Sequence, residues 1–154
     1  MQIAELLTPR GIVPQLRVGN KKAVLQEIAK RGATMTGIAE RAVYEALLER
    51  ERLGTTGIGH GVALPHAKLP ELAQLHGLFL RLDRPVAFEA IDDQPVDLVF
   101  ALLAPAEAGA EHLRALARVS RLLRDAAICQ KLRGTDSADA LFALLADRSE
   151  SRVA

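Results

Sequence analysis

Residues 53–69 read LGTTGIGHGVALPHAKL. Glycines at positions 54, 57, 59 and 61 allow backbone conformations that residues with a Cβ avoid, so this segment can wind closely around a small space. The apolar residues 62–64 then predict a short strand. Pro65 fixes its own φ and favours extended geometry at Leu64, so we predict that His66 lies at the end of that strand, behind a stiff lead-in.

The helix that we predict before this segment carries one charged residue on its apolar face. The pattern predicts a helix from Thr36 to about Leu53, with an apolar face that comprises Ala39, Val43, Ala46, Leu47 and Leu53. Arg50 lies within that face, where a guanidinium is costly to bury without an anion. Two interpretations remain open: Arg50 extends to the surface or pairs with a nearby glutamate, or it points into the same space as His66 and binds an anion there.

The remaining periodicities predict an α/β fold. Residues 96–104 are apolar except for Asp97, which is typical of a strand covered on both faces, and we place this strand at the centre of the sheet. His112 lies in the first turn of a helix that begins near Gly109, at the edge of a predicted buried stripe. The stripe comprises Leu113, Leu116, Ala117, Ser120 and Leu123. The other predicted elements are a helical turn at 3–7, an edge strand at 13–18, a helix at 21–31 between the N-cap Asn20 and the stop signal Gly32, a strand at 76–83 that Arg84 and Pro85 break, a helix up to Arg133 that Asp125 caps, and a last helix from Thr135 or Asp136 to Ala146.

The composition indicates an ordinary soluble protein with a single core. The chain has 154 residues, of which 49% are hydrophobic and 25% charged, so we expect one domain that spans residues 1–154. A formal net charge of +1, without a lysine-rich run or interleaved aromatic residues, argues against nucleic-acid binding. The longest apolar run, residues 98–104, is too short for a bilayer, and the N-terminus lacks a signal pattern. Together with the lone Cys129, which we expect to be a packed thiol, these features predict a cytoplasmic protein that is not membrane-embedded.

Two histidines and one arginine could together carry out phosphoryl transfer. This chemistry needs a neutral imidazole that can attack in line, and donors that stabilise the phosphoryl oxygens. His66 would be the nucleophile, Arg50 would offset the incoming negative charge, and His112 would hydrogen-bond a phosphoryl oxygen or orient the ring. The residues by themselves leave open the alternative that His66 is simply a solvated loop residue.

Two other kinds of site are not expected. His60 and His76 accompany His66, but no set of carboxylates and histidines at ligand spacing completes a metal site. The Gly-x-Gly-x-Gly run precedes a strand and lacks the Gly-Lys-Ser/Thr ending, so it matches neither the dinucleotide fingerprint nor the Walker loop. We therefore expect neither a metal nor a cofactor.

Residues 57–69 resemble the active-site motif of the EIIA proteins of the bacterial phosphotransferase system, in the fructose/mannitol class. The segment 48–51, which contains Arg50, resembles that family's arginine segment, and His112 falls where the family has its second active-site histidine. Residues 88–105, FEAIDDQPVDLVFALLAP, are especially similar to the nitrogen-regulatory branch of the class. The chain departs from the motif at Ala67, where glycine is usual, and at His60, where asparagine is common.

The resemblance implies an EIIA type-2 domain with a mixed, roughly five-stranded sheet flanked by helices. It further implies that His66 accepts a phosphoryl group from a small HPr-like phosphocarrier protein, with Arg50 and His112 as active-site partners. We also expect four residues of the glycine-rich segment to support the phosphate-binding loop, namely Thr55, Thr56, Gly59 and Gly61.

The resemblance favours a phosphocarrier with a regulatory output. Phosphorylation would change which partner surface fits, and no membrane EIIB or EIIC segment follows in the chain. We therefore expect target proteins such as potassium-transport or sensor-kinase components, in nitrogen or potassium physiology. Two alternatives stay open: a sugar-specific EIIA that passes phosphate to a cysteine of an EIIB, and an interaction module that is never phosphorylated. Leu69, Leu72 and Leu75 could form an apolar rim for the carrier or belong to the core.

Overall fold

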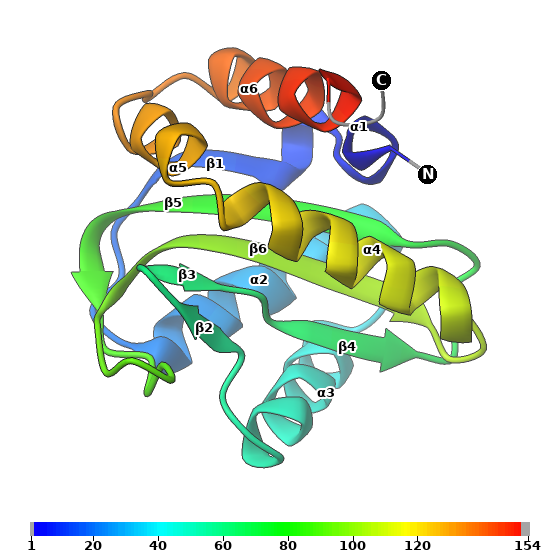
Figure 1. Cartoon of the computed structure of the whole chain (residues 1–154). Helices are drawn as coiled ribbons and strands as arrows, with labels where there is room; N and C mark the ends of the chain where they lie inside the picture. Colours follow the sequence, from blue (N-terminus) through cyan, green and yellow to red (C-terminus); the bar gives the residue numbers. More distant parts are fainter. Residues whose placement is uncertain (1, 152–154) are drawn as a thin grey trace.

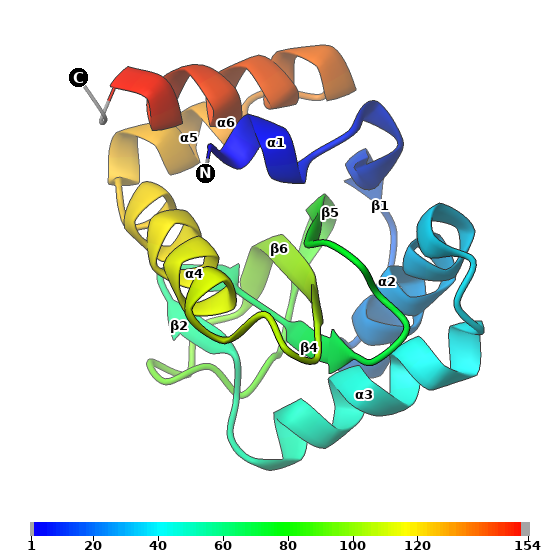
Figure 2. The same ribbon diagram turned by 90° about the vertical axis from the view of Figure 1, so that its right-hand side faces the viewer.

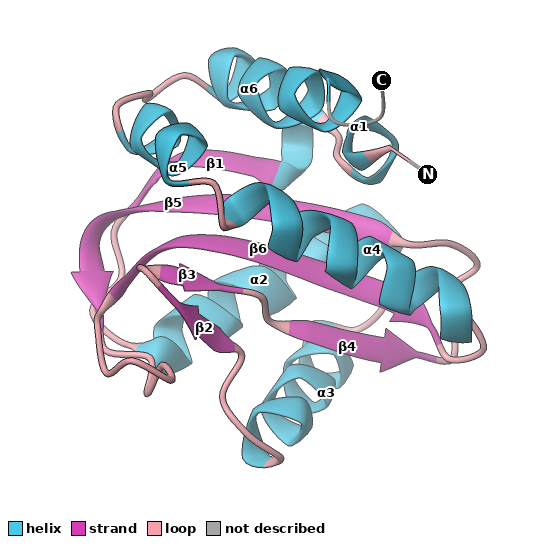
Figure 3. Cartoon of the chain, in the orientation of Figure 1, coloured by secondary structure: helices cyan, strands magenta, loops and turns pink. Residues whose placement is uncertain are grey.

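The structure is a computed structural model that describes residues 2–151, and it places a mixed sheet between two layers of helices (Figure 1). The helical elements are α1 (Ile3–Leu6), the 3-10 turn η1 (Pro9–Gly11), α2 (Lys21–Thr36), α3 (Glu40–Arg52), α4 (Gly109–Leu123), α5 (Ala126–Arg133) and α6 (Ala138–Ser151). The strands are β1 (Ile12–Leu16), β2 (Gly57–Gly59), β3 (Val62–Ala63), β4 (His66–Leu69), β5 (His76–Val86) and β6 (Val96–Pro105), shown in magenta in Figure 3. Within the described residues, none of the helices is both long and apolar enough to cross a membrane.

The central strand is β6, as its apolar sequence predicts. Strand β5 runs antiparallel along one side of β6, and β3 and β4 run parallel to it along the other side. Leu64 and Pro65 separate β3 from β4, and the Pro65 carbonyl still accepts a hydrogen bond from the amide of Leu102 in β6 (3.0 Å). The sheet has six strands, but β3 and β4 share one side of β6, so the strand order β1-β5-β6-β3-β2 has five places and agrees with the predicted architecture.

The alternation of side chains along β6 explains why both faces of the sheet are covered. Side chains from Val99, Ala101 and Leu103 belong to the hydrophobic cluster that contains residues of α2 and α3. Those of Leu98, Phe100 and Leu102 belong to the cluster under α1, α4, α5 and α6. Figure 2 shows the two helical layers on opposite sides of the sheet. A strand whose successive side chains point to opposite faces must be mostly apolar when both faces are buried, and β6 meets this requirement except at Asp97, which pairs with Arg133.

The ends of α2 and α3 agree with the prediction at one point and differ at two. Asn20 caps α2, since its side-chain oxygen accepts the amide of Ala23 (2.8 Å). Gly32 does not end the helix: it lies inside α2, where a Cβ would come within 2.8 Å of Leu103 Cδ1, so its small size lets the helix approach the sheet. The helix ends instead at Gly37, which has a left-handed φ of 80°, and α3 begins at Glu40 rather than at Thr36.

The predicted buried stripe of α4 is wrong by about one residue. The buried residues of this helix are His112, Ala115, Val119, Leu122 and Leu123, whereas Leu113 is 67% exposed. Both the predicted and the observed faces of α4 contain apolar residues at helical spacing, so the periodicity does not choose between them. The observed face is the one that packs against Leu98, Phe100 and Leu102 of β6, and in this orientation His112 points inward.

Several further predictions can be compared with the structure. Strand β5 continues through Arg84 and Pro85 to Val86, with irregular pairing in place of a break. Helix α5 is capped by Asp125, which accepts the amides of Ala127 and Ile128, and α6 begins at Ala138, later than predicted. Cys129 is a buried thiol that donates to the Leu123 carbonyl (3.1 Å), as expected for a packed cysteine, and burial raises its pKa. The core alternative holds for the three leucines that follow the histidine, because they are all buried: Leu69, Leu72 and Leu75.

Candidate functional site

His66 is the first residue of β4, not the last residue of a strand, because the strand predicted over residues 62–64 ends at Ala63 and pairing with β6 resumes after Pro65. The interruption leaves the Leu64 carbonyl free of the sheet and directs it toward the histidine ring. The Nδ1–H group of His66 donates to this carbonyl (2.9 Å). The backbone therefore holds Nδ1, while Nε2 points away from the Leu64 carbonyl.

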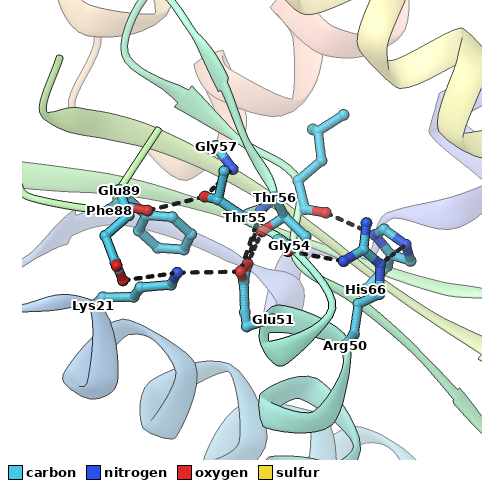
Figure 4. A network of polar contacts seen from close by, with 11 residues as sticks. Lys21, Arg50, Glu51, Gly54, Thr55, Thr56, Gly57, His66, Phe88 and Glu89 are labelled. Carbon is cyan, nitrogen blue, oxygen red and sulfur yellow. Dashed lines mark hydrogen bonds and ion pairs between the residues drawn. The ribbon is translucent and has the colours of Figure 1, made fainter. Parts of the chain in front are cut away.

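Arg50 reaches His66 from the last turn of α3, so the second of the two interpretations of this arginine describes its position. Its Nε–H group donates to His66 Nε2 (3.1 Å), and its Nη1 donates to the carbonyl of Gly54 (2.9 Å). A guanidinium can only donate, so His66 Nε2 must be an acceptor whose lone pair carries no proton. The contacts at the two ring nitrogens thus select the same neutral tautomer, with the proton on Nδ1 (Figure 4).

His112 completes a group of three side chains from three different elements. It lies in the first turn of α4, and its ring stands edge-on to that of His66, with centroids 5.4 Å apart and an interplanar angle of 72°. The residue is 3% exposed. Among the buried side-chain nitrogen and oxygen atoms of the described residues, its Nδ1 is the one without a hydrogen-bond partner. A buried ring nitrogen without a partner is unfavourable unless a group that arrives later can use it.

The three side chains open onto one hollow of about 320 Å³. It is lined by Ala46, Arg50, His66, Ala67, Lys68, Gly109, His112, Leu113 and Leu116. Much of this lining is apolar. The hollow is open to solvent, so another molecule can approach the His66 side chain that lines it.

Both histidines in this hollow are neutral at pH 7. Burial is the largest cause of the lowered pKa of His66, and the positive charges of Arg50 and Lys68 lower this pKa further. The hydrogen bond to the Leu64 carbonyl and the negative charge of Glu51 act in the opposite direction, but the net shift is downward. Burial also lowers the pKa of His112 to about 4, with additional contributions from His66 and Lys68. A neutral imidazole with its Nε2 lone pair free is the form that can act as a nucleophile.

The buried His112 should make the protein less stable in mild acid. In the unfolded chain this group binds a proton near pH 6.5, but in the folded chain it binds one only near pH 4. Between these pH values the unfolded state binds more protons, so the free energy of unfolding should fall as the pH drops, by about 2 kcal/mol from this residue. Urea unfolding at pH 7 and at pH 4.5 measures the effect. The variant His112→Gln should lose less stability over the same interval, and an equal loss would contradict the assignment.

The four residues expected to support a phosphate-binding loop do not line this hollow. The hydroxyl of Thr55 donates to the Phe88 carbonyl (3.0 Å), and Thr56 is buried with its amide and hydroxyl both directed at the carboxylate of Glu51. Gly59 and Gly61 shape the turn between β2 and β3 through positive φ values of 100° and 79°. These four residues fix the shape of the segment that leads to His66, at a distance from its ring.

The two departures from the family motif leave the site complete. Ala67 is buried in β4 opposite Leu103 and does not have the positive φ that would require glycine. His60 has a φ of 55° and is exposed at the β2–β3 turn, where its amide donates to Asp92 and its carbonyl accepts from Arg133. Asparagine also tolerates this left-handed conformation, which explains how the two residue types can share the position. His60 is not among the residues that line the hollow.

Sequence reasoning missed Glu51 and Lys21. Glu51 follows Arg50 directly and its side chain is only 5% exposed, although it lies at the end of a helix where solvent is available. Lys21 lies 3.3 Å from it and comes from the start of a different helix. The only signal in the sequence was the adjacency of Glu51 to the arginine, since nothing in the spacing places Lys21 nearby.

Residues 5–148 match the family described as the phosphoenolpyruvate-dependent sugar phosphotransferase system, EIIA 2. The chain belongs to this family of phosphotransferase-system EIIA proteins, as its fold and the geometry around His66 indicate. Within the family it is similar to nitrogen regulatory proteins. It is 58% identical to the one of Bradyrhizobium diazoefficiens over 146 residues, which cover 95% of each chain. It is 39% identical to the one of Escherichia coli (strain K12) over 148 residues, which cover 96% of this chain and 91% of the relative.

The solved structures include a similar protein of the same kind. The nitrogen regulatory protein IIA-Ntr from Neisseria meningitidis superimposes with a TM-score of 0.89 at 36% sequence identity, over 93% of this chain and 98% of that one. The comparisons confirm the predicted fold class and the predicted resemblance to the nitrogen-regulatory branch.

Proposed function

We propose that this protein is a phosphocarrier whose His66 accepts a phosphoryl group from an HPr-like protein, and that partner proteins respond to its phosphorylation state. The observation that carries the proposal is the arrangement at one atom, His66 Nε2. Its lone pair is unprotonated because Nδ1 holds the proton, it accepts a hydrogen bond from Arg50, and the His66 side chain lines an open hollow. Family membership supports the same chemistry, because this family takes part in phosphoenolpyruvate-dependent phosphotransfer.

The transfer step needs no proton movement at the nucleophile. The Nε2 lone pair attacks the phosphorus of the donor's phosphohistidine, and the new N–P bond forms as the donor's N–P bond breaks and its ring takes back the electron pair. The Nδ1–H group continues to donate its hydrogen bond to the Leu64 carbonyl, and this bond stabilises the positive charge that develops on the ring. For the attack to occur, Arg50 must first give up its hydrogen bond to Nε2, and it then donates to the phosphoryl oxygens instead. His112 lines the same hollow.

The proposed output is regulation of other proteins. A phosphoryl group adds between one and two negative charges to a partly apolar hollow, and this changes which partner surface can bind there. The similarity to nitrogen regulatory proteins supports this output, with potassium-transport or sensor-kinase components as proposed targets. We propose that residues 1–154 act as one EIIA domain in the cytoplasm, where the phosphoryl donor is found.

Reconstitution with the upstream proteins tests the proposal. The chain is incubated with phosphoenolpyruvate, enzyme I and an HPr-like protein, and its mass is then measured. We expect a gain of one phosphoryl group that is labile in acid and stable in base, as a phosphohistidine is. No gain in mass, with a donor shown to be phosphorylated, would favour the interaction module that is never phosphorylated. Rapid onward transfer to the cysteine of an EIIB would instead favour the sugar-transport alternative.

A further inference from the structure

Glu51 is a buried carboxylate beside the site, and the proposed chemistry does not use it. Its side chain is 5% exposed, so it has lost nearly all of its contact with water. Four contacts compensate for this loss. The Thr56 amide donates to both carboxylate oxygens (3.0 and 3.1 Å), the Thr56 hydroxyl donates to one of them, and the Lys21 ammonium lies 3.3 Å from the other. A carboxylate with donors from a loop and from another helix fixes the loop in place.

Lys21 ties this arrangement to the first turn of α2. Its ammonium lies 3.6 Å from the carboxylate of Glu89 and 4.8 Å from the centroid of the Phe88 ring, in addition to its contact with Glu51. Glu89 is exposed and its pairing is weak, whereas Glu51 is buried and its pairing with Lys21 is little screened. Figure 4 shows that Lys21 lies on the side of Glu51 that faces away from His66, and that Thr56 lies above the Glu51 carboxylate, next to Gly54.

The loop between α3 and β2 is bound at two points by neighbouring residues of one helix turn. Arg50 donates to the Gly54 carbonyl, and Glu51 accepts from the Thr56 amide, two residues further on. Consecutive helical residues point about 100° apart, so Arg50 can face His66 while Glu51 faces the loop. The Gly54 carbonyl is the second acceptor of the same guanidinium that donates to His66 Nε2. The position of this carbonyl therefore sets the angle at which Arg50 approaches the ring.

We infer that Glu51 is the positioning residue of this site: by holding Thr56, it keeps the Gly54 carbonyl where Arg50 must donate, and so aims the Arg50 guanidinium at His66 Nε2. The effect of Glu51 on phosphoryl transfer rests on the proposed function. Glu51 itself touches neither the hollow nor the reacting atoms. A guanidinium is planar and rigid, so its Nε–H and Nη1–H groups point in fixed directions relative to each other. If the acceptor of Nη1 moves, the direction of Nε–H therefore changes as well.

A kinetic cycle between Glu51 and Arg50 tests this route of action. Single-turnover transfer from the phosphorylated HPr-like protein is measured at several donor concentrations in Glu51→Ala, Arg50→Ala and the double variant. We expect Glu51→Ala to lower the maximal rate about tenfold, with the half-saturating donor concentration unchanged, because a small misplacement of a catalytic group is costly. In the Arg50→Ala background the same change should have almost no effect. Equal slowing in both backgrounds, or an effect confined to donor affinity, would overturn the inference.

Two conservative variants separate the loop contacts from the charge. The amide oxygen of Glu51→Gln can still accept from Thr56, so this variant should keep a rate within about threefold of the wild type. Thr56→Val removes the hydroxyl but keeps the amide, and its rate should lie between those of Glu51→Gln and Glu51→Ala. The control is Glu27→Ala, which removes an ion pair with Arg31 on α2 at a distance from the hollow and should leave the rate unchanged. If Glu51→Gln is as slow as Glu51→Ala, the assignment to the loop contacts is overturned.

A measurement that needs no phosphoryl donor distinguishes failure of this inference from failure of the proposed function. In the wild-type protein, the Nε–H signal of Arg50 in NMR spectra should be protected from exchange, because it donates to His66 Nε2. Glu51→Ala should lose this protection, and Glu51→Gln should retain it. This comparison decides the positioning role even if His66 never becomes phosphorylated. Protection that is unchanged in a folded Glu51→Ala protein would overturn it.

Discussion

Replacement of His66 by alanine is expected to abolish phosphorylation of the chain, with a loss of at least roughly 1,000-fold in labelling rate. In the described part of the structure, no other side chain combines a free imidazole lone pair, an arginine donor and an open approach. His112 lies nearest, but its side chain is 3% exposed, so an incoming phosphoryl donor has little access to it. Intact-mass measurement after incubation with the phosphorylated HPr-like protein gives the labelled fraction directly.

A second histidine of the same segment provides the matched control. His60 lies six residues before His66 but does not line the hollow, and its φ of 55° suits asparagine. The variant His60→Asn should therefore be labelled at the wild-type rate. Labelling that persists in His66→Ala, with the modification mapped to His112, would exchange the roles of the two rings. Loss of labelling in His60→Asn would show that the turn, and not the nucleophile alone, limits transfer.

The parts of the fold that were predictable are those where one physical requirement dominates. Residues 96–104 must be covered on both faces because they are almost entirely apolar, and β6 is indeed the centre of the sheet. Asn20 supplies the side-chain oxygen that a helix N-terminus needs, and it caps α2. The unusual place of Arg50 on an apolar face could be interpreted in the same way. Such a charge was predicted to reach the surface, to pair with a glutamate, or to face His66 and bind an anion there. In the structure Arg50 contacts His66 and the Gly54 carbonyl, and the binding of an anion stays a prediction.

The errors arose where the sequence satisfies two arrangements equally well. Gly32 and Gly37 are both acceptable ends for α2, and only contact with Leu103 shows that Gly32 serves close packing. Leu53 was expected on a buried face but is 83% exposed, because α3 ends at Arg52 and no longer imposes its periodicity there. The threonines of the glycine-rich segment were expected to support a phosphate-binding loop, and the sequence did not indicate their hydrogen-bond partners. Their hydroxyl groups donate to Glu51 and to the Phe88 carbonyl, partners that only the folded chain brings within reach.

Removal of the Arg50 guanidinium should slow phosphoryl transfer by about 100-fold without unfolding the protein. Arg50→Ala loses the donor that faces His66 Nε2, while the Leu64 carbonyl still holds Nδ1, so the nucleophile keeps its tautomer but lacks the charge that stabilises the incoming phosphoryl group. Arg50→Lys should recover only part of the rate, because a single ammonium cannot donate in the same geometry to Nε2 and to the Gly54 carbonyl. Single-turnover kinetics at saturating donor measures all three rates.

The same variant should also change the titration of the histidine, in a direction that the electrostatics fix. Arg50 lowers the pKa of His66, so its removal should raise that pKa, and NMR titration of the ring can follow the change. Arg52→Ala is the control, since this exposed arginine ends the same helix but does not line the hollow. It should alter neither the rate nor the titration. A slower rate without a raised pKa would mean that Arg50 acts on docking of the donor protein. A raised pKa with an unchanged rate would mean that the phosphoryl group finds its stabilising charge elsewhere.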